Sequence, residues 1–235
     1  MSDHEEGRAP EAEMPFNPLP AMVIVLAVVL GGIEIILQAA GAGYLGGEEG
    51  VGWRIAAIED WGFNGFFFDQ MLERGLWQGD VLIRLVSYAF VHGNATHAVF
   101  AVVFLLALGK VVAETFGNIA VLMVFLVGSA VGALGYYVFT GAEVWLIGGL
   151  PGVYGLIGAY TFILWLGLGA LHQRQIRAFT LIGFLMAAQL LFGLLFGGSP
   201  DWIADLSGFA AGFLISFAIV PGGIKRMVNM LRRRS

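Results

Sequence analysis

Three long stretches of this sequence carry no charged residue, and they constrain its fold more than any other feature. They are residues 119–139, 144–171 and 178–199. Each is close to the ~20 residues that a helix needs to cross the hydrocarbon core of a bilayer. Hydrophobic residues make up 58% of the chain and charged residues only 12%, which is too apolar for a soluble domain of this size. The sequence therefore predicts an all-α protein that crosses a membrane several times.

Three further stretches reach this length only if each includes ionisable residues. They are residues 21–40 with Glu34, 95–112 with His97 and Lys110, and 202–220 with Asp205. A charged side chain at the bilayer centre costs ~2.5–3.5 kcal/mol even on the lenient insertion scale, so these residues require an explanation. We expect six transmembrane helices in a membrane domain that covers residues 19–220.

The Lys and Arg residues predict the orientation, because positive charge is retained on the cytoplasmic side. With six spans, both termini share one side. That side holds Arg8, Lys110, Arg174, Arg177, Lys225, Arg226, Arg232, Arg233 and Arg234, and the other side holds Arg54, Arg74 and Arg84. We therefore expect both termini in the cytoplasm, with a bacterial plasma membrane as the default location.

The flanks differ from the membrane domain in composition. Residues 1–18 are acidic and are predicted to form a disordered cytoplasmic tail without a cleavable signal peptide. Residues 221–235 form a basic tail that suits contact with anionic lipid headgroups. The chain has no cysteine, which excludes disulfides and a cysteine nucleophile. Its net charge of −5 gives no reason to expect a nucleic-acid partner.

Residues 41–85, between the first two predicted spans, mix aromatic with acidic side chains. The aromatic residues are Trp53, Trp61, Phe63, Phe66, Phe67, Phe68 and Trp77, and the acidic residues among them include Glu59, Asp60, Asp69, Glu73 and Asp80. This mixture suits short amphipathic helices in the headgroup layer, because aromatic side chains favour that layer. An ordinary solvated loop is the alternative.

Three segments carry motifs. Residues 84–97 read RLVSYAFVHGNATH, residues 148–160 read GGLPGVYGLIGAY, and residues 200–213 read PDWIADLSGFAAGF. In this order they resemble the fingerprints of the rhomboid family of intramembrane serine proteases, over roughly residues 80–220. The resemblance implies a six-helix rhomboid bundle in which Arg84, His92 and Glu114 are structural motif residues. It further implies that Glu114 satisfies backbone donors in a turn.

The same resemblance implies that the catalytic residues are missing. One register of the motif puts the family's serine at Leu150 and another puts it at Pro151, while the family's catalytic histidine falls on Asp205. The asparagine that helps to stabilise the oxyanion falls on Ala101, although the neighbouring histidine is retained as His97. Residues 146–160 contain no Ser, Thr or Cys. Because serine catalysis needs a nucleophile, a base and oxyanion donors, we expect a pseudoprotease.

Other arrangements of the polar residues stay open. Ser207 and Asp205 could form a relocated dyad, although two residues apart they point to different helical faces. An aspartyl mechanism would pair Asp205 with Glu34 or Asp201.

For His97 and Asp205 we weigh two interpretations. The two side chains could form a hydrogen bond in the cavity, or Asp205 could be a solvated carboxylate stabilised by the helix N-terminus. With His92 they have the ligand types of a two-histidine, one-carboxylate metal site. The spacing alone is weak support for such a site and a packed or solvated histidine is the preferred interpretation, so we expect no metal and no cofactor.

Glycine spacing predicts close helix packing. Glycines three and four residues apart allow helices to approach in lipid, where no hydrophobic drive exists between them. By resemblance the retained cavity residues are Gly149, Gly152, Tyr154, His97 and Asp205, and the packing glycines are Gly155, Gly158, Gly208 and Gly212. The alternative is that these glycines only allow close helix packing, as in many membrane proteins, and do not indicate a functional site.

By resemblance to inactive rhomboids and derlins, such a protein would contact membrane lipids and bind transmembrane segments of client proteins, altering their stability or traffic. One alternative is an intramembrane serine-type endopeptidase with an atypical arrangement. Another is a small transporter or ion relay through Asp205 and His97, although the chain has no inverted repeat.

The charge distribution yields a test of topology. Reporter fusions after Thr140 and Gly198 should report the outer side, and fusions after Gln173 and at Ser235 should report the cytoplasm. Paired alkaline phosphatase and fluorescent reporters make the measurement. An odd number of crossings between the ends of the chain would refute the six-span prediction.

Overall fold

The structure is a computed structural model that describes residues 18–75, 77, 79–140, 144–220, 222 and 229. Apart from residues 18, 222 and 229, the predicted tails at 1–18 and 221–235 therefore lie outside the described residues. Within these described residues, six helices are long and apolar enough to cross a membrane, counting the turn before α9 as part of its span. They are α1 (Ala21–Gly41), α6 (Ala95–Phe116), α7 (Asn118–Thr140), α8 (Leu150–Ala170), α9 (Thr180–Phe196) and α10 (Trp202–Ile219). The prediction of an all-α, six-span bundle is confirmed.

The helix boundaries follow from local chemistry. Asn94 caps α6, because its side-chain oxygen accepts a hydrogen bond from the backbone N–H of His97 at 2.9 Å. α6 runs four residues beyond the predicted end at Val112 and stops before Gly117, whose φ of 97° is rarely adopted by other residues. Pro151 lies in the first turn of α8, where a missing N–H costs nothing.

The fourth span begins later than predicted. The uncharged run suggested a helix over 144–171, but α8 starts at Leu150. The residues before it are held by backbone hydrogen bonds to other segments. Leu146 exchanges two such bonds with Phe63, at 2.8 and 3.1 Å, and the N–H of Gly148 donates to the Tyr88 carbonyl at 2.9 Å. These bonds satisfy the backbone without a helix, which hydrophobicity alone could not predict.

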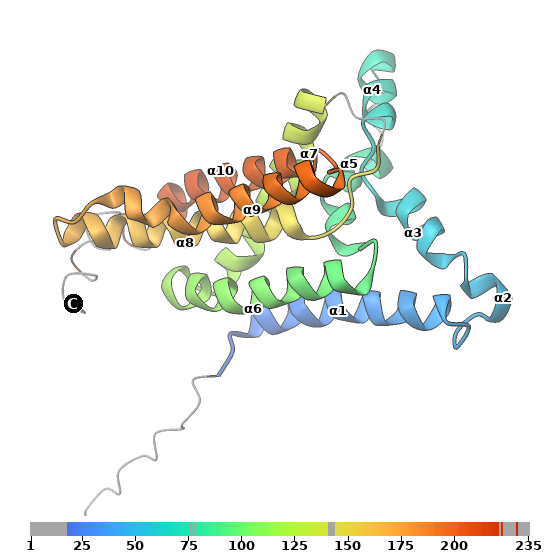
Figure 1. The fold of residues 1–235 in the computed structure, drawn as a ribbon, viewed down its shortest axis with the longest axis horizontal. Helices are drawn as coiled ribbons and strands as arrows, with labels where there is room; N and C mark the ends of the chain where they lie inside the picture. The colour runs from blue at the N-terminus through green and yellow to red at the C-terminus, as the bar shows by residue number, and fades with distance from the viewer. Residues whose placement is uncertain are drawn as a thin grey trace, which may run out of the picture.

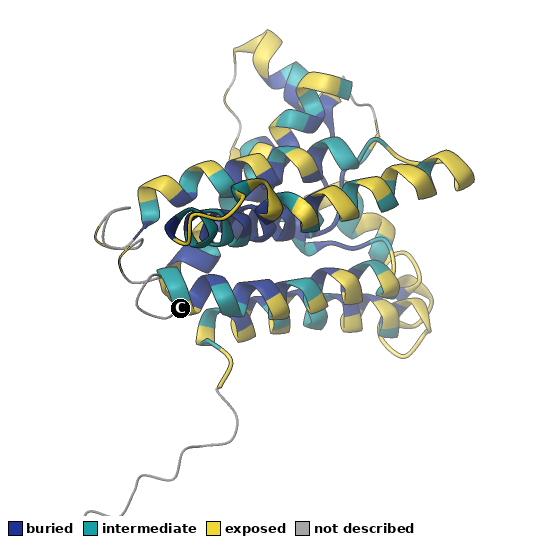
Figure 2. Ribbon diagram, turned by 60° about the vertical axis from the view of Figure 1, so that its left-hand side comes forward, coloured by how far each residue is buried: buried dark blue, intermediate teal, exposed yellow. Residues whose placement is uncertain are grey.

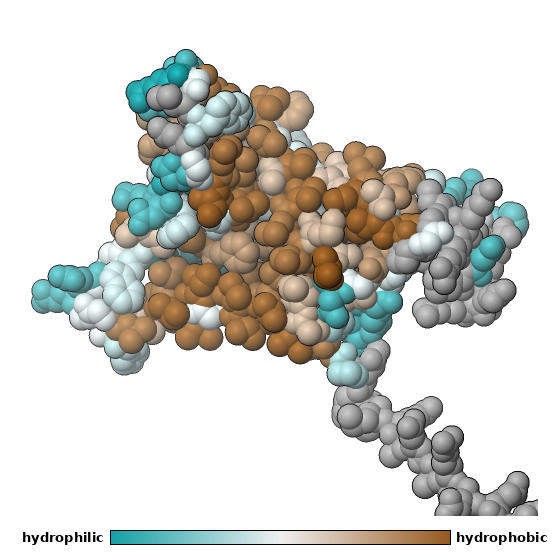
Figure 3. All heavy atoms as spheres, turned by 180° about the vertical axis from the view of Figure 1, so that it is seen from behind, coloured by the Kyte–Doolittle hydropathy of each residue, from teal (hydrophilic) through white to brown (hydrophobic). Residues whose placement is uncertain are grey.

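Short helices gather at one end of the bundle (Figure 1). They are α2 (Gly47–Gly50), α3 (Trp53–Trp61), α4 (Gly65–Arg74) and α5 (Gly79–Ser87), followed by the 3-10 turn η1 (Tyr88–Phe90). α1 ends there and α8 and α10 begin there, so α1 runs toward the short helices whereas α8 and α10 run away from them (Figure 1). This arrangement agrees with an even number of crossings. In Figure 3, an apolar band separates hydrophilic residues at the two ends of the visible face.

α8 is the central helix. Fourteen of its residues are buried, and Figure 2 shows the buried residues concentrated at the middle of the bundle. α8 packs against α7 and α10 at positions where a glycine of one helix faces the backbone of the neighbouring helix. A Cβ on Gly212 would collide with the Gly155 carbonyl, and one on Gly158 would collide with the Phe209 carbonyl. The close approach of α8 and α10 therefore depends on the absence of side chains at these positions.

α9 is the least packed span. Only one of its residues, Ile182, is buried. Its large side chains face outward, with Leu194 83% and Phe196 76% exposed. Compared with α8, this helix has few apolar contacts to hold it in place.

The glycine contacts yield a stability prediction. Gly212→Ala should lower the free energy of unfolding by about 1–3 kcal/mol, because the added methyl meets backbone that cannot move aside. Gly183→Ala on α9 is the matched control, since nothing lies within 4 Å of its Cβ position. The control should be neutral or stabilise by up to about 1 kcal/mol. Unfolding in detergent titrations measures both, and equal effects would contradict the proposed packing.

Candidate functional site

The motif residues meet at the end of the bundle where α8 and α10 begin. Pro151 is buried, and its Cβ would lie 2.7 Å from a Cβ built on Gly132 of α7. Leu150 is half-buried and packs against the main apolar core. In either register, the serine position of the family is therefore occupied by an apolar side chain in contact with other apolar groups.

Asp205 lies at the start of α10, with only 1% of its surface exposed. Its Oδ2 accepts a hydrogen bond of 2.8 Å from Nε2 of Gln189 on α9. The Oε1 of Gln189 in turn accepts a bond of 3.3 Å from the Tyr154 hydroxyl on α8. One polar chain, Tyr154–Gln189–Asp205, thus joins three transmembrane helices.

The hydrogen bonds between Tyr154, Gln189 and Asp205 show that both interpretations of Asp205 were wrong. Among the described residues its side chain bonds to Gln189 and not to His97, and its burial excludes a solvated carboxylate. Gln189 was missed because no motif points to it. The available signal was that Gln189 is the only amide in the uncharged run 178–199. An amide inside a membrane needs a partner as much as a carboxylate does.

His92 and His97 pack against each other, edge to face, with ring centroids 5.2 Å apart. His97 lies beside Gly148, where a Cβ would collide with the imidazole. His92 is fully buried, and its Nε2 accepts a bond of 3.3 Å from the N–H of Gly149. Burial, with a smaller contribution from His97, lowers the pKa of His92 to about 4. The neutral ring is therefore an acceptor that holds the loop before α8.

The two motif glycines at this loop face other backbone and side chains. A Cβ on Gly149 would lie 3.0 Å from the Ala89 carbonyl, and one on Gly152 would lie 2.6 Å from the Ser129 hydroxyl. Ser129 itself is buried and donates to the Phe125 carbonyl at 2.8 Å. This hydroxyl is therefore already engaged within its own helix.

The other candidate chemistries gain no support from the geometry. The Ser207 hydroxyl faces Gly135 on α7, in a lipid-side groove away from Asp205. Glu34 is engaged elsewhere, and Asp201 accepts a bond of 2.6 Å from Ser199. In the part of the chain that the structure describes, no three His, Cys, Asp or Glu residues lie close enough to hold a metal ion. Ala101 is buried and offers no donor.

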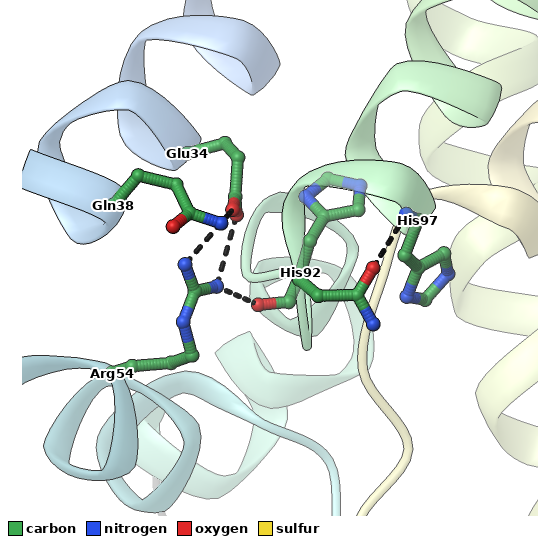
Figure 4. A network of polar contacts seen from close by, with 6 residues as sticks. Glu34, Gln38, Arg54, His92 and His97 are labelled. Carbon is green, nitrogen blue, oxygen red and sulfur yellow. Dashed lines mark hydrogen bonds and ion pairs between the residues drawn. The ribbon is translucent and has the colours of Figure 1, made fainter. Parts of the chain in front are cut away.

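Glu34 has a partner that the sequence did not reveal. Its carboxylate receives bonds of 2.8 and 3.0 Å from Arg54 of α3 and one of 3.0 Å from Gln38 (Figure 4). Arg54 also donates to the His92 carbonyl. Glu34 is only 5% exposed, so this partner explains how a carboxylate is accommodated within the first span. The pair neutralises a buried carboxylate and ties α1 to the loop that carries His92.

Arg84 organises the short helices. Its guanidinium donates to the Glu59 carbonyl at 2.7 Å and to the Gly62 carbonyl at 3.0 Å. It also lies over the rings of Phe67 and Trp145, at 5.3 and 5.9 Å. At the other end of the bundle, the Glu114 carboxylate is 4.0 Å from the Lys110 ammonium.

Comparison with known proteins agrees with this architecture. The family model of the Rhomboid domain matches residues 79–222. The RHOMBOID-like protein 4 of Arabidopsis thaliana is 27% identical over 146 residues, which cover 61% of this chain and 35% of the plant protein. The chain belongs to the rhomboid family. Its match covers about a third of the length of that relative.

The polar chain yields a coupling prediction. Removing Gln189 or Asp205 alone strands the other group in the membrane, so Gln189→Ala and Asp205→Ala together should cost less than the sum of the two losses. We expect a coupling of about 0.6–2 kcal/mol in the free energy of unfolding. The control cycle pairs Asp205→Ala with His97→Ala and should be additive within about 0.5 kcal/mol. Coupling to His97 but not to Gln189 would contradict the geometry.

Proposed function

We propose that this protein is a non-catalytic rhomboid-like membrane protein that binds transmembrane segments of client proteins and thereby alters their stability or traffic. One observation carries the proposal. The side chain at the position of the family's catalytic histidine, Asp205, is a buried carboxyl group bonded to the Gln189 amide, and the serine position is apolar.

The chemistry of acyl transfer supports the loss of activity. A nucleophile must be hydrogen bonded to a base, and donors must face the developing oxyanion. Here the base position is occupied by Asp205, the nucleophile position by Leu150 or Pro151, and the asparagine position by Ala101. Removing one member of a catalytic triad already costs several orders of magnitude in rate.

Two features favour the binding of helices. The groove between α7 and α10 has a volume of about 560 Å³ and includes small residues that permit close helix approach. These small residues are Gly135, Ser207, Ala210 and Ala211. α9 is loosely packed, with only Ile182 buried, and its movement would open the polar contact between Gln189 and Asp205. Membrane lipids are the other partner, and both termini are proposed to face the cytoplasm of a plasma membrane.

A second candidate, an atypical intramembrane serine endopeptidase, has one observation in its favour. His97, at the position of the family's oxyanion histidine, still lies beside Gly148 in the loop before α8. Without a serine in this loop, such activity would have to draw its nucleophile from another helix.

Client co-purification and a cleavage assay separate the two functions. From native membranes, the tagged protein should recover membrane proteins, and in proteoliposomes it should leave generic rhomboid substrates uncut. Mass spectrometry identifies the clients, and gel analysis follows cleavage. Asp205→Ala is the control for cleavage. Hydrolysis by the wild type that disappears in this variant would establish the endopeptidase.

A further inference from the structure

Gln189 makes the polar contact between α9 and the rest of the bundle, and α9 has few buried apolar side chains. It is half-buried on α9, and its amide bridges Asp205 on α10 and Tyr154 on α8. α10 and α9 otherwise meet little, and only Ile182 of α9 is buried. Leu181, Leu185 and Met186 of α9 also pack against the apolar core, but they are only partly buried. The Gln189 amide adds a polar link from α9 to α10 and α8.

Asp205 depends on this amide in return. Gln189 is the donor to its carboxyl group, and the residue is almost fully buried. Inside a membrane no water replaces a lost donor, and an unsatisfied buried acceptor bears its full desolvation cost. Any movement of α9 away from α10 must therefore supply Asp205 with another hydrogen-bond donor.

A cavity reaches the Gln189 side of this contact, whereas the buried Asp205 does not line it and would be reached only when the amide moves away. The cavity has a volume of about 570 Å³ and lies between the end of α9 and the start of α10. Gln189 lines it, together with Phe192, Ser199, Asp201 and Trp202. Apolar walls with an amide and a carboxylate suit a helix that brings one polar side chain with an apolar remainder.

We propose that Asp205 is a specificity-determining residue that selects client segments carrying a hydrogen-bond donor, and that Gln189 occupies its acceptor site until such a segment binds. The donor is an amide, amine or guanidinium on a transmembrane helix, at the depth of the first turn of α10. This inference rests on the proposed function, since it names the class of segment that the protein binds.

An apolar segment fits this position less well. It would displace Gln189 without replacing its hydrogen bond, and Asp205 would be left unpaired. A donor-bearing segment exchanges one hydrogen bond for another and adds its own packing. The exchange therefore discriminates between helices of equal hydrophobicity.

The test uses two synthetic transmembrane peptides that differ at one position. Both are Leu/Ala helices, one with Gln and one with Leu a single turn from the outer end. Fluorescence energy transfer in liposomes measures their binding to the full chain. We expect the Gln peptide to bind the wild type about three- to tenfold more tightly.

Variants assign this preference to the two residues. Asp205→Leu should abolish the preference while the Leu peptide still binds. Gln189→Leu, which leaves Asp205 in place and removes the internal occupant, should increase the preference. Ser216→Ala is the matched control and should leave it unchanged, because this buried hydroxyl of the same helix bonds only to the Gly212 carbonyl. Gln189→Leu keeps the test decisive if Asp205→Leu does not fold.

The outcomes separate the inference from the function on which it rests. Equal binding of the two peptides to the wild type, or an undiminished preference in Asp205→Leu, would overturn the inference alone. Failure of both peptides to bind any folded variant would overturn the client-binding function and the inference together.

Discussion

The backbone contact between α8 and α10 is the constraint on which the rest of the structure depends. Gly155, Gly158 and Gly212 bring the two helices so close that a single methyl group would collide with a carbonyl. Because hydrophobic surface gives no drive between helices in lipid, this fit supplies the packing that holds the bundle together. It also fixes the start of α8 beside the start of α10, so the scaffold sets the positions of Leu150 and Asp205.

Polar groups attach the outer helices to this centre. Arg54 neutralises Glu34 and joins α1 to α3 and to the His92 carbonyl. Gln189 joins α9 to Asp205 and, through its other end, to Tyr154. The first link is an ion pair with several bonds, whereas the second depends on one amide. α1 is therefore the more firmly attached helix, and α9 is the one that the proposed client segment would displace.

The sequence predicts the spans well, because an uncharged run of twenty residues has few alternatives in a membrane. The sequence is a poorer guide to helix boundaries and side-chain partners that depend on contacts between distant segments. The start of α8 was placed six residues early, since backbone bonds to Phe63 and Tyr88 replace helical ones before Leu150. Neither of the two interpretations of Asp205, a bond to His97 or a solvated carboxylate, was right. Its hydrogen-bond donor lies on α9, and Gln189 belongs to no motif.

Covalent labelling by a fluorophosphonate tests the central claim most directly, because this probe reacts only with a serine that a base has activated. The account predicts that the intact mass of the folded protein stays unchanged after incubation in liposomes, beside an active rhomboid protease as the reacting control. A single adduct, lost when one serine is replaced by alanine, would contradict it.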